Sequence, residues 1–344
     1  MNVLLTGAFG SIGYETLKQF LELDQYEVYA FDLDNKRNRK RQKQLPKKEN
    51  IHYLYGNIND EKLVEQIVSK VDVILHLAAI IPPLADQNPE LARKVNYYGT
   101  KNLLDAIKKK NPKCFLLYAS SVSVYGDRLQ NPYIKVGDPL NPSEGDYYAY
   151  TKIETEKLIQ EYKIPYTIFR FTGIMGRPDL DPLMFHMPLD TKMEIATTKD
   201  TAFALIRSLE KQKELNGHIY NLSGGEKCRT TYRDFLTHMF QIYGLSTKYL
   251  KEIAFAEQNF HCGYFKDGDK LEEILHFRYD TLESYYQRVE AETKKSTRFF
   301  AHIFSRPILY FVTKKSEPLR AIKTKNHFLL QRFFKERREN HRQN

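Results

Sequence analysis

A glycine-rich segment near the start of the chain constrains its fold more than any other feature. The segment reads Thr6-Gly7-Ala8-Phe9-Gly10-Ser11-Ile12-Gly13 and directly follows the apolar run Val3-Leu4-Leu5. Gly7 permits a tight turn, Gly10 lets phosphates approach the backbone, and Gly13 lets a helix lie close on the preceding strand. Such a turn directs backbone N–H groups and the positive end of a helix at one spot, where a dinucleotide pyrophosphate can bind. The G-x-x-G-x-x-G spacing is also found in ordinary strand-to-helix turns.

A second strand and an acidic residue complete a βαβ unit after this turn. A helix is expected over 14–23 and a strand over 26–31, and Asp32 stands at the end of that strand. This is close to the distance at which an acid binds the adenosine ribose, so Asp32 favours NAD. The basic run from Lys36 to Lys43 leaves NADP open, because bases near the ribose can hold its 2′-phosphate. A run this dense is more often a solvated loop or helix face.

Strand-like and helix-like segments alternate as far as residue 171. Further strands are expected over 51–55, 73–77, 114–119 and 166–171, and helices over 60–69, 89–110 and 147–162. Mostly apolar strands in this alternation predict an α/β fold, a doubly wound parallel sheet with helices on both faces. Ligands of such sheets bind at the carboxyl ends of the strands.

Tyr148 and Lys152 form the residue pair that most clearly indicates chemistry. They stand four residues apart on a predicted helix and therefore share one face. A tyrosine pKa of about 10 makes a poor base, but we expect the Lys152 ammonium and a positive nicotinamide ring to favour the phenolate. Ser121, at the end of the strand over 114–119, can donate a hydrogen bond to a substrate carbonyl oxygen. The same spacing also occurs on ordinary helix surfaces, and serines after strands also cap turns.

Together these residues resemble the extended short-chain dehydrogenases/reductases, in the NAD-dependent epimerase/dehydratase family. The resemblance rests on the segment 6–13, Asp32, Leu75-His76-Leu77-Ala78-Ala79, Val95-Asn96 with Gly99-Thr100 and Asn102, Ser120-Ser121, Val124-Tyr125-Gly126, Tyr148 with Lys152, and Arg170. It covers residues 1–180 and continues more weakly to about residue 289. It implies a Rossmann fold with Ser121, Tyr148 and Lys152 as catalytic residues. The cofactor contacts that it implies are Gly7, Phe9, Gly10, Ser11, Ile12, Gly13, Asp32, Asn57, Ile58, Leu77, Ala78, Ala79, Asn96, Tyr148 and Lys152. Asn57 departs from the acid that the family usually has beside the adenine.

The resemblance implies hydride transfer between a substrate carbinol or ketone and the nicotinamide, and the residues leave three functions open. The first is an epimerase or oxidoreductase acting on a sugar or sugar nucleotide. The second is a reductase or dehydrogenase of a non-sugar carbonyl or hydroxy substrate. The third is a non-catalytic dinucleotide-sensing scaffold at a membrane surface, which the complete set of catalytic residues disfavours.

Departures from the family's patterns bear on the substrate. Ser121-Val122-Ser123 carries no carboxylate where the related 4,6-dehydratases have an acid and a base, so sugar dehydration is disfavoured. Gly173 stands where nucleotide-sugar enzymes have an Asn that contacts the diphosphate. The stretch from Gly176 to Asp200 is short for a nucleobase pocket. The segment Ile80-Ile81-Pro82-Pro83 is expected to form one apolar wall, and the loop over 127–146 is long enough for a lid.

Charge separates a neutral body from a basic C-terminal segment. Residues 294–344 hold 14 Lys or Arg and 3 Asp or Glu, and the rest of the chain holds 39 and 40. We expect a Rossmann domain over 1–175, a smaller substrate lobe over 176–293 interleaved with it, and a basic, aromatic-rich tail over 294–344. The aromatic run over 299–312 is interrupted by Arg306-Pro307 and is not expected to span a bilayer. It fits contact with an anionic membrane surface, or packing on the body or on a second subunit.

The remaining expectations concern the small lobe, the cysteines and the partners. Helices are expected over 230–243, 248–258, 270–275 and 282–292. Cys114, Cys228 and Cys262 lie far apart, which predicts neither disulfides nor a metal site. Met1 leads directly into the first strand without a signal peptide, which favours a cytoplasmic location, with membrane association left open. A small-molecule substrate is expected, a homodimer is left open, and no nucleic acid is expected.

Overall fold

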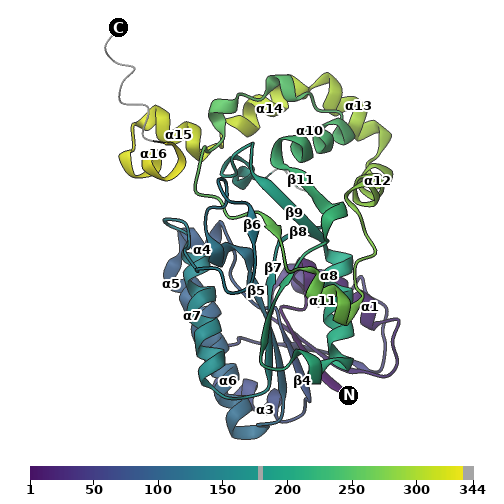
Figure 1. The fold of residues 1–344 in the computed structure, drawn as a ribbon. Helices are drawn as coiled ribbons and strands as arrows, with labels where there is room; N and C mark the ends of the chain where they lie inside the picture. Colours follow the sequence, from purple (N-terminus) through teal and green to yellow (C-terminus); the bar gives the residue numbers. More distant parts are fainter. Residues whose placement is uncertain (177–180, 336–344) are drawn as a thin grey trace.

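A parallel sheet of seven strands forms the centre of the larger lobe (Figure 1). The computed structural model describes residues 1–176 and 181–335. The strands lie in the order β10-β7-β5-β4-β1-β2-β3, and neighbouring strands run parallel. Their bounds are β1 Asn2–Thr6, β2 Glu27–Asp32, β3 Ile51–Tyr55, β4 Val73–His76, β5 Phe115–Ser121, β7 Tyr166–Phe171 and β10 His218–Leu222. The chain reverses its direction across the sheet between β1 and β4, which opens a ligand crevice at the carboxyl ends of these strands.

The predicted Rossmann sheet is confirmed. Of the six strands expected from the sequence, those over 51–55 and 166–171 match the observed bounds, and the other four differ by at most two residues at an end. The seventh strand, β10, was not predicted. It lies at the edge of the sheet beside β7, and its sequence mixes polar and apolar residues. An edge strand covers less of the core, so it lacks the continuous apolar run that revealed the other strands.

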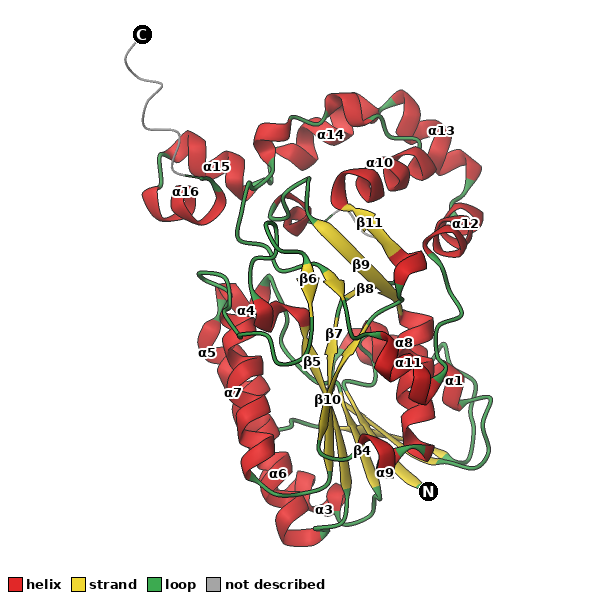
Figure 2. Ribbon diagram, in the orientation of Figure 1, coloured by secondary structure: helices red, strands yellow, loops and turns green. Residues whose placement is uncertain are grey.

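Helices cover both faces of the sheet (Figure 2). One face carries α1 (Ser11–Phe20), α8 (Thr198–Arg207) and α11 (Asp269–Leu275), and the other carries α3 (Glu61–Val68), α6 (Gly99–Lys110) and α7 (Tyr147–Glu161). Leu5 of β1 packs in the first core and Leu4 in the second, because successive strand residues point to opposite faces. Both leucines are at most 1% exposed, so this strand is covered on both sides.

The helix predicted over 89–110 is divided into three pieces. It consists of α5 (Pro89–Ala92), the π-helical turn η1 (Arg93–Tyr98) and α6. The wider π turn contains Asn96, which is buried and bonds to the backbone of Ile80 through both of its side-chain polar atoms. Single π turns within helices are frequently found at functional sites.

The smaller lobe consists of a three-stranded sheet and its covering helices. The strands β8 (Gly173–Met175), β9 (Lys192–Thr197) and β11 (Arg229–Thr231) lie in the order β11-β9-β8, and α10 (Tyr232–Tyr243) and α12 (Leu282–Glu292) pack over them. The loop over 127–146 is tied to this lobe by β6 (Tyr133–Ile134), which pairs with β12 (Tyr264–Phe265). The expected lid is therefore anchored by backbone hydrogen bonds.

The prediction of a helix over 248–258 is wrong. This segment contains two short 3₁₀ turns, η6 (Thr247–Tyr249) and η7 (Glu252–Ala254). Its backbone bonds to other parts of the chain: the Ser316 hydroxyl donates to the Ala254 carbonyl, and the Ala256 amide donates to the Phe185 carbonyl. Tertiary contacts thus replace the hydrogen bonds that a helix would have made.

Four helices follow the small lobe at the C-terminal end. They are α13 (Lys295–Ile303), α14 (Ser305–Thr313), α15 (Glu317–Thr324) and α16 (His327–Phe333). Residues 336–344 of the expected basic tail, and 177–180 of the short stretch before Asp200, lie outside the described residues. In the described ranges no helix is both long and apolar enough to cross a membrane. The division of the chain at residues 175 and 293 stays a prediction.

Candidate active site

The glycine-rich turn joins β1 to α1 and forms a cradle for an anion. Gly7 has a φ of +68°, and a Cβ on Gly13 would come within 2.2 Å of the Gly7 carbonyl oxygen. Gly10 is the N-cap of α1 and supplies no side-chain cap, and the first turn of α1 contains no acidic residue. The first amides of a helix lack partners within the helix, so they are available to bind phosphate oxygens here.

Asp32 ends β2 and is held against this turn. Its carboxylate accepts hydrogen bonds from the amide of Phe9, at 2.8 Å, and from the amide of Leu33, at 2.7 Å. These bonds fix the carboxylate beside the turn, where the sequence places the adenosine ribose. The Arg41 guanidinium lies nearby and donates to the Phe9 carbonyl at 2.5 Å.

The basic run over 36–43 forms a short helix, α2 (Lys36–Gln42), that the sequence did not predict. Arg39 pairs with Asp34 through two 2.9 Å bonds and lies 3.8 Å from the centre of the Tyr55 ring. Arg39 and Arg41 thus both bind other groups of this protein: Arg39 binds Asp34, and Arg41 binds the Phe9 carbonyl.

Asn57 and Ile58 follow β3, on the side where the resemblance places the adenine. The Asn57 side chain accepts from the amide of Asn59 at 3.0 Å and closes a turn. Ile58 is 6% exposed and packs against Gly99, where a Cβ would lie 2.5 Å from its side chain. The Ile58 side chain therefore belongs to the core.

The end of β4 lies directly beside the glycine-rich turn. Ala78 touches Gly7, where a Cβ would lie 2.8 Å from the Ala78 amide nitrogen, and that amide donates to the Thr6 hydroxyl. The same hydroxyl bonds to His76 Nδ1 at 2.7 Å, and His76 Nε2 bonds to the Thr100 hydroxyl at 2.9 Å. Burial, with the nearby Lys152 charge, lowers the His76 pKa to about 3. His76 is therefore neutral at pH 7, and the sequence pattern did not indicate this state.

Ser121, Tyr148 and Lys152 come together at the carboxyl end of β5. Ser121 ends this strand and hydrogen-bonds to the Tyr148 side chain. Lys152 is 3% exposed and donates to the Ala119 carbonyl at 2.6 Å. Its ammonium lies 5.4 Å from the centre of the Tyr148 ring and 4.6 Å from that of Tyr118. The three predicted side chains form one cluster, and their catalytic roles stay predictions.

Burial and neighbouring groups shift the pKa values of Tyr148 and Lys152 in opposite directions. Burial raises the pKa of Tyr148, the Asp146 carboxylate raises it further, and the hydrogen bond with Ser121 lowers it. Burial also lowers the pKa of Lys152 to about 7, although Glu156 opposes this shift. We expected the Lys152 ammonium and a positive nicotinamide ring to favour the phenolate together, and this stays a prediction for the site with its cofactor. Without the cofactor, desolvation outweighs the hydrogen bond and favours the phenol.

Asn96 links the cluster to the wall after β4. Its side-chain oxygen accepts from the Ile80 amide at 2.7 Å, and its nitrogen donates to the Ile80 carbonyl at 3.0 Å and to the Thr151 hydroxyl at 3.0 Å. Thr151 immediately precedes Lys152 on α7. Asn96 therefore fixes the segment after β4 against the helix that carries the tyrosine and the lysine.

A buried ion pair joins α7 to β7. Arg170 of β7 binds Glu156 through two hydrogen bonds, at 3.0 and 2.6 Å, and the two side chains are 5% and 2% exposed. The Ser120 hydroxyl also donates to Glu156, and Arg170 donates to the Tyr125 hydroxyl at 2.8 Å. Arg170 belongs to the resembling motif, but its partner Glu156 was missed. Its position four residues after Lys152, on the same helix face, was the available signal.

The cysteines lie apart from this cluster. Cys114, Cys228 and Cys262 are free and buried, and burial raises the pKa of each thiol to about 12. Within residues 1–176 and 181–335, no group of three or more His, Cys, Asp or Glu side chains is arranged to hold a metal ion.

Comparison with known proteins gives a family and several relatives. A model of the NAD dependent epimerase/dehydratase family matches residues 3–189. UDP-glucuronate 4-epimerase 6 of Arabidopsis thaliana is 31% identical over 202 residues, which are 54% of this chain and 43% of that protein. D-erythronate dehydrogenase of Haemophilus influenzae is 30% identical over 172 residues, which are 47% of this chain and 50% of that protein. The chain thus spans about half the length of these curated relatives.

Solved structures share the fold over most of the chain. The dTDP-glucose 4,6-dehydratase DesIV of Streptomyces venezuelae, with NAD bound, has a TM-score of 0.72 at 20% identity and covers 85% of this chain and 96% of its own. The UDP-glucuronic acid 4-epimerase of Bacillus cereus, in complex with UDP-glucuronic acid and NAD, has a TM-score of 0.68 at 20% identity and covers 85% and 99%. At this level of identity the likeness shows the fold.

Proposed function

Because this chain belongs to the NAD dependent epimerase/dehydratase family, whose model matches more than half of it, we propose that it moves a hydride between a carbinol carbon of its substrate and NAD. One observation carries the proposal: Ser121, Tyr148 and Lys152 cluster at the carboxyl end of β5. The glycine-rich turn lies at the same edge of the sheet, because β5 and β1 both pair with β4 in parallel.

The residues around the turn fit NAD. The uncapped start of α1 and the space that a Cβ on Gly7 or Gly13 would fill suit a pyrophosphate. Asp32 is positioned to bind the two hydroxyls of an adenosine ribose, and its charge would repel a 2′-phosphate. The Arg41 guanidinium donates to the Phe9 carbonyl and not toward a 2′-phosphate, and this supports NAD over NADP. When bound, NAD accepts the hydride and returns it.

The protein's own residues handle the proton of the substrate hydroxyl. Tyr148 takes this proton during oxidation and returns it during reduction, while Ser121 donates a hydrogen bond to the same substrate oxygen. Lys152 is placed to hold the nicotinamide ribose and to favour the phenolate when protonated. Since burial raises the Tyr148 pKa, the substrate and a positive nicotinamide must change the charges around the phenol before it can act as a base.

We propose a sugar or sugar nucleotide as the substrate and epimerisation as the reaction. The relative that acts as a UDP-glucuronate 4-epimerase supports this assignment. Epimerisation requires only that the ketone turn over in the site and take back the hydride on its other face. Water elimination would need an acid and a base, and Val122 and Ser123 supply neither.

A second candidate function is dehydrogenation of a non-sugar hydroxy acid or reduction of the corresponding carbonyl. The relative D-erythronate dehydrogenase and the presence of Gly173 in place of a diphosphate-binding Asn favour it. The same three side chains serve both reactions, which differ in whether the ketone leaves the site. A homodimer and a cytoplasmic location are also proposed.

Mass spectrometry of the nucleotide released from the denatured protein tests the function, together with titration of the stripped protein with NAD(H) and NADP(H). Retained NAD(H) would favour an epimerase, which regenerates its cofactor in every cycle. An empty protein with micromolar, exchangeable NAD(H) binding would favour the dehydrogenase. Preference for NADP(H) would contradict the role given to Asp32, and absence of binding by either cofactor would contradict the proposed hydride transfer.

A further inference from the structure

The helices α13 and α14 lie at the far end of the small lobe (Figure 1). They present large apolar side chains to solvent. Six such side chains are between 51% and 62% exposed: Phe299, Phe300, Ile303, Phe304, Tyr310 and Phe311. We call this set the outer apolar face. Single exposed apolar residues are ordinary on a protein surface, but six large ones within thirteen residues of two consecutive helices indicate an interaction site.

The inner sides of these helices are already occupied, which fixes the direction of the outer face. Leu309 of α14 is fully buried in the core of the small lobe, and Ala301, Ile308 and Val312 pack against that core. The Ser305 hydroxyl accepts the Ser246 amide at 2.8 Å, which ties the start of α14 to the same lobe. The outer face therefore cannot turn inward without breaking this packing.

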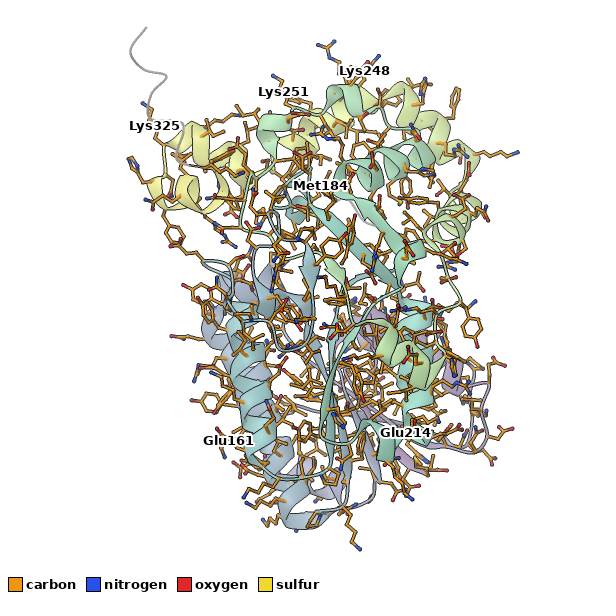
Figure 3. All side chains as sticks on the ribbon, viewed as in Figure 1. Glu161, Met184, Glu214, Lys248, Lys251 and Lys325 are labelled. Atoms are coloured by element: carbon orange, nitrogen blue, oxygen red, sulfur yellow. The ribbon has the colours of Figure 1, made fainter. Side chains whose placement is uncertain are left out.

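Basic residues accompany the outer apolar face in the sequence. The segment over 294–315 contains six Lys or Arg and no Asp or Glu. The Lys314 ammonium lies 4.5 Å from the centre of the Tyr310 ring and 5.7 Å from that of Phe311, so charge and aromatic surface are adjacent. Lys248 and Lys251, from neighbouring turns of the chain, are exposed and point outward at the same end of the molecule (Figure 3).

We propose that the outer apolar face docks the protein on an anionic phospholipid bilayer. Aromatic and aliphatic side chains would enter the interfacial region, and the surrounding lysines and arginines would contact the anionic headgroups. Helices of nine residues are too short to span the membrane, so they would lie in its plane. This inference goes beyond the proposed hydride transfer and does not depend on it.

The charge of the face argues against a second copy of the chain as its occupant. Two such faces in contact would bring together like charges. The segment over 294–315 has no carboxylate of its own, although Arg298 pairs with Glu290 of α12 at 2.7 Å. Burying unpaired like charges opposes association, whereas an anionic surface neutralises them. Charge complementarity therefore favours the bilayer.

The chain contains no tryptophan, which allows a direct test. In the full-length protein, Phe311→Trp places a single tryptophan on the outer apolar face, and Tyr279→Trp places one at a site that is 66% exposed on a different part of the surface. Both variants would be mixed with vesicles of phosphatidylcholine alone or with phosphatidylglycerol added. We expect a blue shift of the emission for Phe311→Trp with the anionic vesicles and none for Tyr279→Trp.

Vesicle sedimentation of the full chain measures the strength of docking. We expect the triple variant Phe299→Ser, Phe300→Ser, Phe311→Ser to lose at least about tenfold in partition onto anionic vesicles, because each ring contributes buried apolar area. Tyr279→Ser should pellet like the wild type. Circular dichroism and NAD(H) binding would show that the variants keep their fold and their cofactor site.

Three results would overturn the proposal. The first is equal emission from Phe311→Trp with and without anionic vesicles. The second is a dimer that the triple serine variant converts to a monomer without lipid, which would identify a second copy as the occupant. The third is a blue shift with a single-stranded oligonucleotide but not with vesicles. None of these outcomes bears on whether Tyr148 and Lys152 carry out hydride transfer.

Discussion

Tyr148 works in surroundings that oppose its ionisation in this structure. Burial and the Asp146 carboxylate raise its pKa, and only the Ser121 hydrogen bond lowers it. We predict that Tyr148→Phe lowers turnover roughly 10²- to 10⁴-fold while NAD(H) binding and thermal stability change little, because the ring is kept and only the proton carrier is lost. Steady-state kinetics on an identified substrate would check this. Tyr150→Phe, which alters an exposed tyrosine on the same helix, should keep full turnover. An active Tyr148→Phe variant would contradict the catalytic assignment.

His76 should make the stability of the protein depend on pH in the acid range. Its pKa is about 3 in the fold and about 6.5 in the unfolded chain, so the unfolded state binds an extra proton between these values. The contribution of His76 to stability is present above pH 6.5 and is lost as the pH falls toward 3, by roughly 1.4 kcal/mol per pH unit.

Urea unfolding between pH 3 and 7 would test this dependence. The His76→Gln variant should show a flatter pH dependence of the free energy of unfolding than the wild type. The variant His302→Gln, at an exposed position on α13, shows whether replacing any histidine has this effect. Parallel curves for the wild type and His76→Gln would mean that the buried imidazole is not neutral in the fold.

At the scale of elements, α7 carries two glutamates whose ion pairs differ in burial. Glu156 pairs with Arg170 inside the protein, and Glu154 pairs with Arg93 on the surface at 2.6 Å. We predict that Glu156→Gln lowers the free energy of unfolding by about 3–5 kcal/mol, because it leaves a buried guanidinium without its counter-charge. Glu154→Gln should change it by less than about 1 kcal/mol, because water already screens that pair. Similar effects of both substitutions in chemical denaturation would show that burial does not determine how much each ion pair contributes to stability.

In the turn between β1 and α1, we expect Gly13 to matter for stability and Gly10 for cofactor binding. A Cβ on Gly13 would meet the Gly7 carbonyl oxygen at 2.2 Å, so Gly13→Ala should cost roughly 1–3 kcal/mol of stability. A Cβ on Gly10 would meet only that oxygen, at 3.2 Å, so Gly10→Ala should fold normally but bind NAD about tenfold or more weakly, because the methyl group blocks the approach of the phosphates. Thermal melting and NAD titration of both variants would check this, and unchanged NAD affinity in Gly10→Ala would place the pyrophosphate elsewhere.

At the scale of the whole molecule, the candidate cofactor site consists of residues that are far apart in the sequence. The turn after β1, Asp32 and the cluster on β5 and α7 all lie at the carboxyl ends of the strands of one sheet. We predict that NAD at about 100 times its dissociation constant stabilises the folded protein by roughly 2.7 kcal/mol, which raises the melting temperature by a few degrees. Differential scanning calorimetry of the stripped protein would check it. An equal rise with NADP would argue against selection by Asp32.

The sequence predicted the parallel sheet, its family and the residues of the candidate site. Short-range patterns were sufficient for this, because a glycine turn, an acid after a strand and a Tyr-x-x-x-Lys spacing are each local. Val3-Leu4-Leu5 and the other inner strands are buried on both faces, so their apolar runs were easy to recognise.

Only the tertiary structure decided which charges act on those residues. The neutral state of His76, the partnership of Arg170 with Glu156 and the raised pKa of Tyr148 depend on burial and on neighbours from other elements. The 3₁₀ turns over 247–254 and the outward direction of Phe311 likewise follow from contacts with distant segments. Local propensity carries no information about desolvation or long-range packing, and these are the terms that set the chemistry of the site and the exposure of the C-terminal helices.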